Sequence, residues 1–220
     1  MNINLKTSDL FECKTDYLKE LFDASTYPWD MIPLIKDYII SLVFKGIPDF
    51  KKLSDMVLVG ENVKIHPSAV IIPPAILGDE TELRPGSFIR GNVITGRGCV
   101  IGNSTEIKNS ILLDGVQVPH YNYVGDSILG NKAHMGAGSI CSNLKSDGKN
   151  IVIHMDTPIN TGLRKLGAIL ADNADIGCSC VLNPGTVVGK GTRVYPLLAL
   201  RGVYPGNSIV KSADKYVKMV

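Results

Sequence analysis

The chain has 220 residues, enough for one domain with a small appendage. Its 23 Lys and Arg residues nearly balance 21 Asp and Glu residues, and no Lys/Arg-rich run indicates a nucleic-acid partner. Five cysteines without a paired framework are typical of a reducing cytosol. The N-terminus has no secretory signal, and the longest apolar run, residues 38–44, is too short to span a bilayer. We therefore expect a cytoplasmic protein without a membrane partner.

The first 56 residues differ in kind from the rest of the chain. Ser8 is a good N-cap for a first helix, whose apolar face runs to Phe22. After a break at residues 27–29, a second apolar stretch predicts a helix that ends near Gly46. Because repeat proteins need covered ends, we expect this helical appendage to cap the first coil of the following repeat or to contact neighbouring subunits. A role in gating a substrate site is the alternative.

From Val59 onward, a large aliphatic residue recurs about every six positions. The series is Val59, Ile65, Ile71, Leu77, Leu83, Ile89, Thr95, Ile101, Ile107, Leu112, Val118, Val124, Leu129, Met135 and Cys141, then, after a pause, Leu170, Ile176, Leu182, Val188, Val194 and Leu200. The step shortens to five at residues 107–112 and 124–129. This period is typical of a hexapeptide β-helix, an all-β solenoid with three hexads in each triangular coil. The 21 hexads predict about seven coils.

Each aliphatic side chain is expected to point inward and to stack on its equivalents, while backbone groups pair between coils. The chain then divides into a helical appendage at 1–56, a β-helix domain at 57–210 and a tail at 211–220. A loop at 142–165 interrupts the β-helix. Three of the cysteines occupy inward positions and are expected to be buried packing residues: Cys99, Cys141 and Cys180.

Three segments around the shortened steps carry polar residues that a β-helix does not need. They are Glu106-Ile107-Lys108-Asn109-Ser110, Val118-Pro119-His120-Tyr121-Asn122-Tyr123-Val124-Gly125-Asp126 and Met135-Gly136-Ala137-Gly138-Ser139-Ile140-Cys141-Ser142-Asn143. Together they resemble the left-handed β-helix acetyltransferase domain of bifunctional UDP-N-acetylglucosamine pyrophosphorylase/glucosamine-1-phosphate N-acetyltransferases. The resemblance covers roughly residues 75–210.

Two further segments, Arg164–Ile169 and Leu182–Gly185, are similar to archaeal sugar-1-phosphate nucleotidylyltransferase/acetyltransferases. The helical N-terminus resembles that of short stand-alone pyrophosphorylase-related proteins. The resemblance implies a left-handed parallel β-helix, acetyl-CoA as co-substrate, no metal, and a homotrimer that builds each site between subunits. The implied activity is acyl-CoA-dependent N-acetyl transfer to an amino-sugar phosphate or a nucleotide-sugar-like acceptor. The sequence shows no Gly-rich nucleotide loop, so we expect no uridylyl transfer.

The resemblance also implies roles for individual residues. A family histidine acts as general base on the amino group that attacks the thioester, and His120 matches it; histidine accepts a proton near neutral pH. Residues that would bind the phosphate and sugar of the acceptor are Arg90 or Arg84, Lys108, Tyr123, Asn143 and Lys165. Residues that would contact the acyl-CoA are Ala137, Cys178 and Pro196, with the Ala137 N–H facing the thioester carbonyl.

Two of these assignments have alternatives. Arg84 matches the family's Arg-Pro-Gly motif, but it does not align with Lys108 over one coil. Arg90 precedes Lys108 by 18 residues, which is one coil, so the spacing favours Arg90. The family's further lysine corresponds to Lys149 or Lys165, and counting back from the resumed repeat favours Lys165.

The chain also departs from the family pattern. His134 stands where the family has Asn, and Cys178 replaces a Ser near the thioester. Pro196 replaces an Ala, and the basic tail that holds coenzyme A in the bacterial enzymes has no clear match after Val210. We still expect acetyl-CoA to bind, whereas the acceptor is unidentified.

Three other functions compete with this interpretation. A γ-class carbonic anhydrase is also a left-handed β-helix, but the four histidines are separated by 54, 14 and 20 residues and lack the spacing of its zinc ligands. A non-catalytic scaffold would show the same repeat. A scaffold would have no reason to keep the polar set Lys108, His120, Tyr123 and Asn143. O-acyl transfer, with the same histidine deprotonating a hydroxyl, is the remaining alternative.

Overall fold

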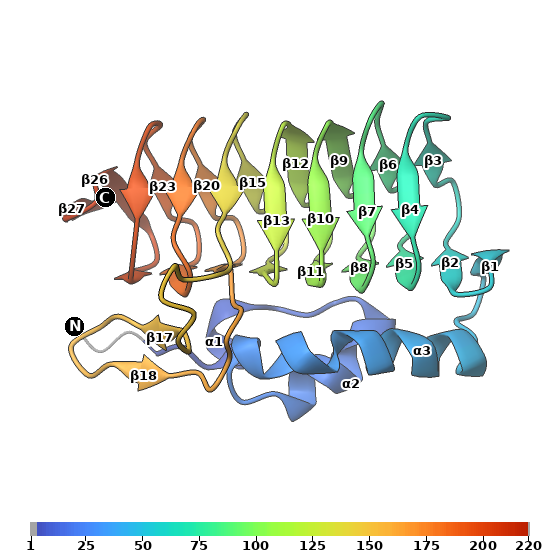
Figure 1. Ribbon diagram of the computed structural model, residues 1–220, viewed down its shortest axis with the longest axis horizontal. Coiled ribbons are helices and arrows are strands. Elements are labelled where there is room, and N and C mark those ends of the chain that lie inside the picture. Colours follow the sequence, from blue (N-terminus) through green and yellow to red (C-terminus); the bar gives the residue numbers. More distant parts are fainter. Residues whose placement is uncertain (1–3, 220) are drawn as a thin grey trace.

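The computed structural model describes residues 4–219. Its N-terminal part is helical, and its larger part is a left-handed parallel β-helix (Figure 1). The helices are α1 (Thr7–Leu10), α2 (Asp16–Ala24), the 3-10 helix η1 (Pro28–Leu34) and α3 (Ile35–Lys45). None of the helices in residues 4–219 has the length and apolar character needed to cross a membrane.

The β-helix has three faces, which we name A, B and C in the order in which each coil visits them. Face A contains β2 (Val57–Val59), β5 (Ala75–Leu77), β8 (Val93–Thr95), β11 (Ser110–Leu112), β14 (Ile128–Leu129), β19 (Ala168–Leu170), β22 (Thr186–Val188) and β25 (Val203–Tyr204). Face B contains β3 (Lys64–Ile65), β6 (Glu82–Leu83), β9 (Val100–Asn103), β12 (Gln117–His120), β15 (His134–Met135), β20 (Asp175–Ile176), β23 (Arg193–Val194) and β26 (Ser208–Ser212). Face C contains β4 (Val70–Ile72), β7 (Phe88–Arg90), β10 (Glu106–Lys108), β13 (Tyr123–Gly125), β16 (Ile140–Cys141), β21 (Val181–Leu182) and β24 (Ala199–Leu200).

The predicted solenoid is confirmed, and two of its three sheets have more strands than the seven coils that the sequence predicts. Faces A and B are nine-stranded sheets within residues 4–219, each ending in one antiparallel strand, and face C has seven strands. The antiparallel strand of face A is β1 (Lys51–Ser54), which covers the edge of β2. That of face B is β27 (Lys215–Lys218), which pairs with β26, so the predicted tail forms the turn and the second strand of a hairpin.

The interior is the stack of aliphatic side chains that the six-residue period predicts. On face C the register aligns Ile89 with Ile107, Val124 and then Cys141. All four side chains are fully buried, as are Cys99 and Cys180, which confirms the inward positions of the three cysteines. The core is therefore built by the large inward residue of each face together with a smaller inward residue two positions earlier, as Cys99 precedes Ile101 and Cys180 precedes Leu182.

Aspartates satisfy the backbone at the corner between faces A and B, which we call the AB corner. Asp79 Oδ1 accepts from the Glu61 N–H, and Asp114 Oδ1 accepts from the Arg97 N–H, both at 2.8 Å. Asp172 repeats the contact two coils further along the axis. A corner turns the backbone away from the sheet, so these side chains supply the acceptors that a strand partner would otherwise provide.

The N-terminal helices lie along face A, whereas the sequence predicts that they cap the first coil or contact neighbouring subunits. Figure 1 shows them running beside the strands of this face, parallel to the long axis of the solenoid. The outward residues of face A are apolar and buried beneath the helices and the inserted segment: Leu58, Ile76, Ile94, Ile111, Ile128, Ile169 and Val187. An apolar outer face must be covered, and the helices remove this stripe of side chains from water.

The insertion at 142–165 is folded. Its strands β17 (Val152–Ile153) and β18 (Ile159–Asn160) form an antiparallel hairpin that lies near the N-terminal helices (Figure 1). Ile151 and Ile153 are fully buried in the same apolar cluster as the helices. The insertion therefore helps to cover the outer surface of the solenoid.

Candidate active site

The predicted base and the three predicted acyl-CoA contacts lie on one edge of the solenoid. This edge is the corner between faces B and C, which we call the BC corner. The carbonyl of His120 accepts from Gly138 N–H at 3.0 Å, and that of Ala137 accepts from Ser179 N–H at 2.8 Å. The carbonyl of Cys178 then accepts from the N–H of Leu197, the residue after Pro196, at 2.9 Å. His120, Ala137, Cys178 and Pro196 thus occupy equivalent positions in four consecutive coils.

Two backbone donors on this edge are not used by the fold. Among residues 4–219, neither the Ala137 N–H nor the Cys178 N–H has a hydrogen-bond acceptor. The side chains of His120 and Cys178 are exposed on the same edge. The BC corner therefore offers an exposed imidazole beside backbone donors that a bound carbonyl oxygen can use.

Asn122 fixes the shape of this edge, a role that the sequence does not predict. Its side chain is buried, and its Oδ1 accepts from the His120 N–H at 3.1 Å. Its Nδ2 donates to the carbonyl oxygens of Gly136 at 2.8 Å and Ser139 at 3.2 Å in the next coil. One amide therefore holds the turn at His120 against the turn that contains Ala137.

Cationic residues lie on face C, as the 18-residue spacing predicted. The register of β7 and β10 aligns Ile89 with Ile107, so Arg90 and Lys108, the next residues, stack in adjacent coils. Arg90 also forms an ion pair with Glu106 at 2.8 Å, and this hydrogen bond raises the pKa of the arginine. The sequence does not predict this role of Glu106, because the contact with Arg90 depends on how far the two side chains extend between neighbouring strands.

Tyr123 connects the BC corner with the opposite edge of face C, the CA corner. It begins β13 beside the BC corner, and its hydroxyl lies over Gly125, where a Cβ would be only 2.6 Å away. The Asn143 amide donates to this hydroxyl at 3.3 Å. Burial, then the charges of Asp126 and Glu106, raise the pKa of Tyr123, which keeps its hydroxyl protonated.

A chain of hydrogen bonds extends from Tyr123 to the N-terminal helices. Asn143 Nδ2 also contacts Asp126 Oδ2, and Asp126 Oδ1 accepts from Asn109 Nδ2 at 2.7 Å. Asn109 Nδ2 reaches the Ile32 carbonyl in η1 at 3.4 Å. Asp126 is buried, so these contacts compensate the removal of its carboxylate from water.

The structure separates the residues for which the sequence left alternatives. Arg84 lies at the BC corner, where it pairs with Glu82 at 3.1 Å, away from the Arg90–Lys108 stack. Lys165 is exposed and forms an isolated β-bridge with Leu144, the residue after Asn143. Lys149 lies further out in the insertion, where its N–H donates to Asp147. Of the two lysines, Lys165 is therefore the one whose backbone pairs next to Asn143.

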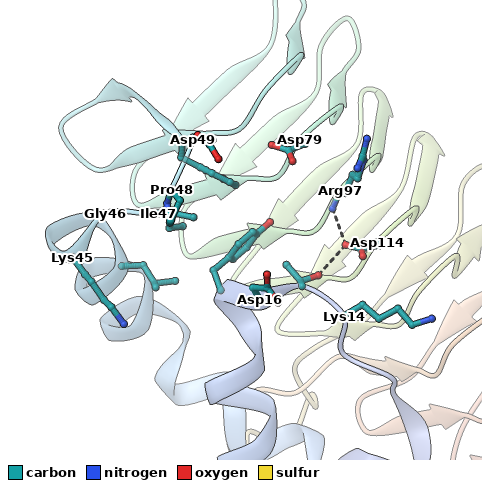
Figure 2. A pocket seen from close by; sticks show the side chains of 14 residues that line it. Lys14, Asp16, Lys45, Gly46, Ile47, Pro48, Asp49, Asp79, Arg97 and Asp114 are labelled. Carbon is teal, nitrogen blue, oxygen red and sulfur yellow. Dashed lines mark hydrogen bonds between the residues drawn. The ribbon is translucent and has the colours of Figure 1, made fainter.

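A separate pocket of about 620 Å³ lies at the AB corner, between the helices and the solenoid (Figure 2). Its carboxylates serve the fold: Asp114 accepts from Thr15 Oγ1 at 2.9 Å and from the Arg97 backbone, and Asp79 holds the preceding coil. Tyr17 donates to the Thr95 carbonyl at 2.6 Å. The pocket is thus part of the contact between the helices and face A, and it contains none of the predicted site residues.

His134, which replaces the family's Asn, is paired on face B. Its Nδ1 lies 2.8 Å from Asp175 Oδ1 in the adjacent coil. Within residues 4–219, no three or more His, Cys, Asp or Glu side chains are grouped in a way that can hold a metal ion.

Comparison with known proteins identifies the family. The family described as GMPPB C-terminal domain matches residues 71–204. A bifunctional sugar-1-phosphate nucleotidylyltransferase/acetyltransferase from Sulfurisphaera tokodaii is 32% identical over 77% of this chain and 43% of that protein. A bifunctional protein GlmU from Methanococcus maripaludis is 32% identical over 87% of this chain and 47% of that protein. The chain thus spans less than half the length of these relatives.

A solved structure, the UDP-N-acetylglucosamine acyltransferase from Campylobacter jejuni, aligns with a TM-score of 0.49 and 14% identity over 71% of this chain and 67% of that one. The family match and the identity to the two curated relatives agree with the resemblance found in the sequence. The chain therefore belongs to the GMPPB C-terminal domain family, as a left-handed β-helix domain related to bifunctional nucleotidylyltransferase/acetyltransferases.

Proposed function

We propose that this protein is an acyl-CoA-dependent N-acetyltransferase that acts on an amino-sugar phosphate or a nucleotide-sugar-like acceptor. His120 is the general base, and the acyl-CoA lies along the BC corner. The proposal is supported by family membership and by the alignment of His120 with Ala137, Cys178 and Pro196 on one edge. Uridylyl transfer is not part of the proposed activity.

The observation that carries this proposal is the unused Ala137 N–H one coil from His120. In acyl transfer the carbonyl oxygen of the thioester gains negative charge, and a fixed N–H donor stabilises that charge. An imidazole in the adjacent coil is then in reach of the attacking amine, because neighbouring coils are separated by about 4.8 Å. A scaffold gains nothing from an unpaired donor beside an exposed histidine.

The reaction follows from these groups. The amino nitrogen of the acceptor forms a bond to the thioester carbon, and His120 takes the proton that the nitrogen loses. The tetrahedral intermediate holds its negative oxygen against the Ala137 N–H. When the intermediate collapses, the C–S bond breaks and the leaving thiolate takes the proton from His120. The products are the N-acetylated acceptor and free coenzyme A.

The acceptor's phosphate is assigned to the cations of face C. Arg90 and Lys108 stack in adjacent coils, and fixed cations of this kind bind phosphate through charge-assisted hydrogen bonds. The Tyr123 hydroxyl donates to the phosphate or the sugar, and Asn143 Oδ1 accepts from the sugar. Lys165 supplies a further cation beside Asn143, and Arg84 is the alternative to Arg90.

We assign the working state to a homotrimer, with each site between two subunits. His120 and Cys178 are exposed in the single chain, so a second surface is needed to exclude water from the thioester. Face C also exposes apolar side chains, including Val70 at 52% and Ile72 at 44%. Sedimentation equilibrium at micromolar concentration tests this assignment, and a monomer contradicts it.

A screen for coenzyme A release tests the activity. The protein is incubated with acetyl-CoA and with free amino sugars, their 1-phosphates, nucleotide amino sugars and the matching hydroxyl sugars. We expect turnover with a phosphorylated or nucleotide-linked amino sugar. Turnover with the hydroxyl sugars alone indicates O-acetyl transfer instead. Absence of turnover with every acceptor favours the scaffold.

A further inference from the structure

A second polar pocket lies beside the insertion, at the CA corner of the later coils. It has a volume of about 490 Å³, and its lining includes Ser142, Lys145, Asp147, His154, Asn183 and Arg201. We propose that this pocket binds a phosphate group, with Arg201 and Lys145 as its cationic ligands. No role follows for these residues from the resemblance or from the proposed reaction.

Arg201 is held in place by a neutral partner. Its Nη2 lies 2.8 Å from His154 Nε2, and because a guanidinium only donates, this imidazole nitrogen must accept. Burial, then the charges of Arg201 and Lys145, lower the pKa of His154, in keeping with a neutral ring. Arg201 forms no ion pair with a carboxylate of residues 4–219. Its positive charge is therefore oriented but not neutralised.

The single carboxylate in the lining compensates only one of the two cations. Asp147 Oδ2 pairs with Lys145 Nζ at 3.2 Å, and Asp147 Oδ1 accepts from the Lys149 N–H at 3.0 Å. The lining therefore keeps an excess positive charge from Arg201. The hydroxyl groups of Ser142 and Ser146 add neutral donors at the same pocket. A phosphate, which has several acceptor oxygens and negative charge, matches this set.

The pocket depends on tight docking of the hairpin, so its shape is part of the fold. Gly202 has φ +95°, and a Cβ there would be 2.9 Å from the His154 carbonyl oxygen. A Cβ at Gly185 would be 2.7 Å from Ile151 Cγ2. The two glycines let the insertion approach the solenoid closely enough for His154 to meet Arg201.

The pocket shares face C with the proposed acceptor site. Ser142 directly follows β16, the neighbour of the strand that carries Tyr123, and Arg201 directly follows β24, two strands further on. At about 4.8 Å per strand, the pocket extends from roughly 5 to 14 Å from Tyr123 along the axis. The phosphate can thus belong to the acyl-CoA or to the acceptor. This choice of source rests on the proposed function, whereas phosphate binding itself does not.

Calorimetric titration of the whole chain with inorganic pyrophosphate tests the site without turnover. We expect Arg201→Gln to weaken binding about tenfold or more, as for a lost charge-assisted hydrogen bond. Asp147→Asn should tighten binding, because it removes the one carboxylate of the lining. Arg193→Gln is the matched control, since Arg193 is exposed on face B of the same coil, and it should bind like the wild type.

The opposite signs expected for Arg201→Gln and Asp147→Asn exclude general unfolding as the cause. If wild-type protein does not bind pyrophosphate, or if Arg201→Gln and Arg193→Gln bind it equally, the proposal is overturned. This result is independent of whether acyl transfer is detected, so the two proposals fail separately.

Titrations with coenzyme A, dephospho-coenzyme A and glucosamine 1-phosphate identify the source of the phosphate. A defect of Arg201→Gln with coenzyme A alone assigns the pocket to its 3′-phosphate. A defect with both coenzymes assigns it to their diphosphate, and a defect with the sugar phosphate alone assigns it to the acceptor. Unchanged affinity for all three contradicts a phosphate role in the proposed reaction.

Discussion

The side-chain amide of Asn143 donates a hydrogen bond to the hydroxyl oxygen of Tyr123 at 3.3 Å. The same Nδ2 contacts the carboxylate of Asp126, which only accepts, so the orientation of the amide is fixed. Because the Tyr123 hydroxyl oxygen accepts this hydrogen bond, the hydroxyl proton can be donated to a ligand. Asn143 Oδ1 is left as an acceptor beside it. A tyrosine donor next to an amide acceptor suits a sugar phosphate, which carries both acceptors and hydroxyl donors.

Replacing Tyr123 by Phe should therefore weaken acceptor binding selectively. We expect KM for the acceptor to rise about tenfold, since a hydrogen bond to a charged group contributes about 1.5–3 kcal/mol. KM for acetyl-CoA should stay unchanged, because the BC corner is not altered. Tyr121→Phe is the matched control, as Tyr121 is exposed two residues earlier. Equal acceptor KM values for the two variants would remove Tyr123 from the site.

Replacing Asn122 by Ala should lower kcat, because it frees the backbone turns that carry His120 and Ala137. The variant loses the contacts to the His120 N–H and to the Gly136 and Ser139 carbonyls. We expect a loss of about 2–4 kcal/mol in the free energy of unfolding, because buried groups lose partners. The lower kcat follows because the His120 and Ala137 turns are no longer held together.

The control for Asn122→Ala is Thr192→Ala, which removes a buried hydrogen bond to the Pro205 carbonyl in a distant coil. It should reduce stability, as measured by urea unfolding, without changing kcat. If both variants show the same kcat below their unfolding transitions, Asn122 has only a structural role.

The inward residues of the solenoid could be predicted because hydrogen bonding between coils repeats one position on every face. Ile89, Ile107 and Val124 align in the structure as their spacing required. The covering of face A does not follow from the six-residue period, because that period describes inward positions only. A signal was present: Ile76, Ile94 and similar residues place an apolar residue just outside the core in every third hexad.

The site could be predicted in part, because motif residues at known spacing fall on defined faces. The shortened steps carry a further signal. They make two coils 17 residues long, so Asn109, Asp126 and Asn143 stack at one corner and form hydrogen bonds with each other. The Arg201–His154 contact was not predictable, since it depends on how the insertion folds back onto a later coil.

The apolar layer on face A should be essential for stability. Ile111 is fully buried beneath the N-terminal helices, so Ile111→Ala should cost about 2–5 kcal/mol in the free energy of unfolding. Leu53→Ala is the control, because Leu53 is 52% exposed on β1 and its truncation should cost far less. Urea unfolding measures both values. Equal stability of the two variants would mean that the helices do not pack on this face.

Cysteine labelling should report on the BC corner. Burial raises the pKa of Cys99 and of Cys141 to about 12 each, so both thiols stay protonated and unreactive in the folded protein. The exposed Cys178 should react first with iodoacetamide, as mass spectrometry would show, and saturating acetyl-CoA should slow this reaction. Labelling of Cys178 at the same rate with and without acetyl-CoA would place the coenzyme elsewhere.

The most direct test of the account is the release of coenzyme A by the His120→Ala variant. We predict a fall in kcat of at least about a hundredfold, the usual contribution of a general base, with acetyl-CoA binding and the fold preserved. His66→Ala is the control, since His66 is an exposed histidine at the BC corner of an earlier coil, and it should turn over like the wild type. Undiminished turnover in His120→Ala would contradict the proposed mechanism.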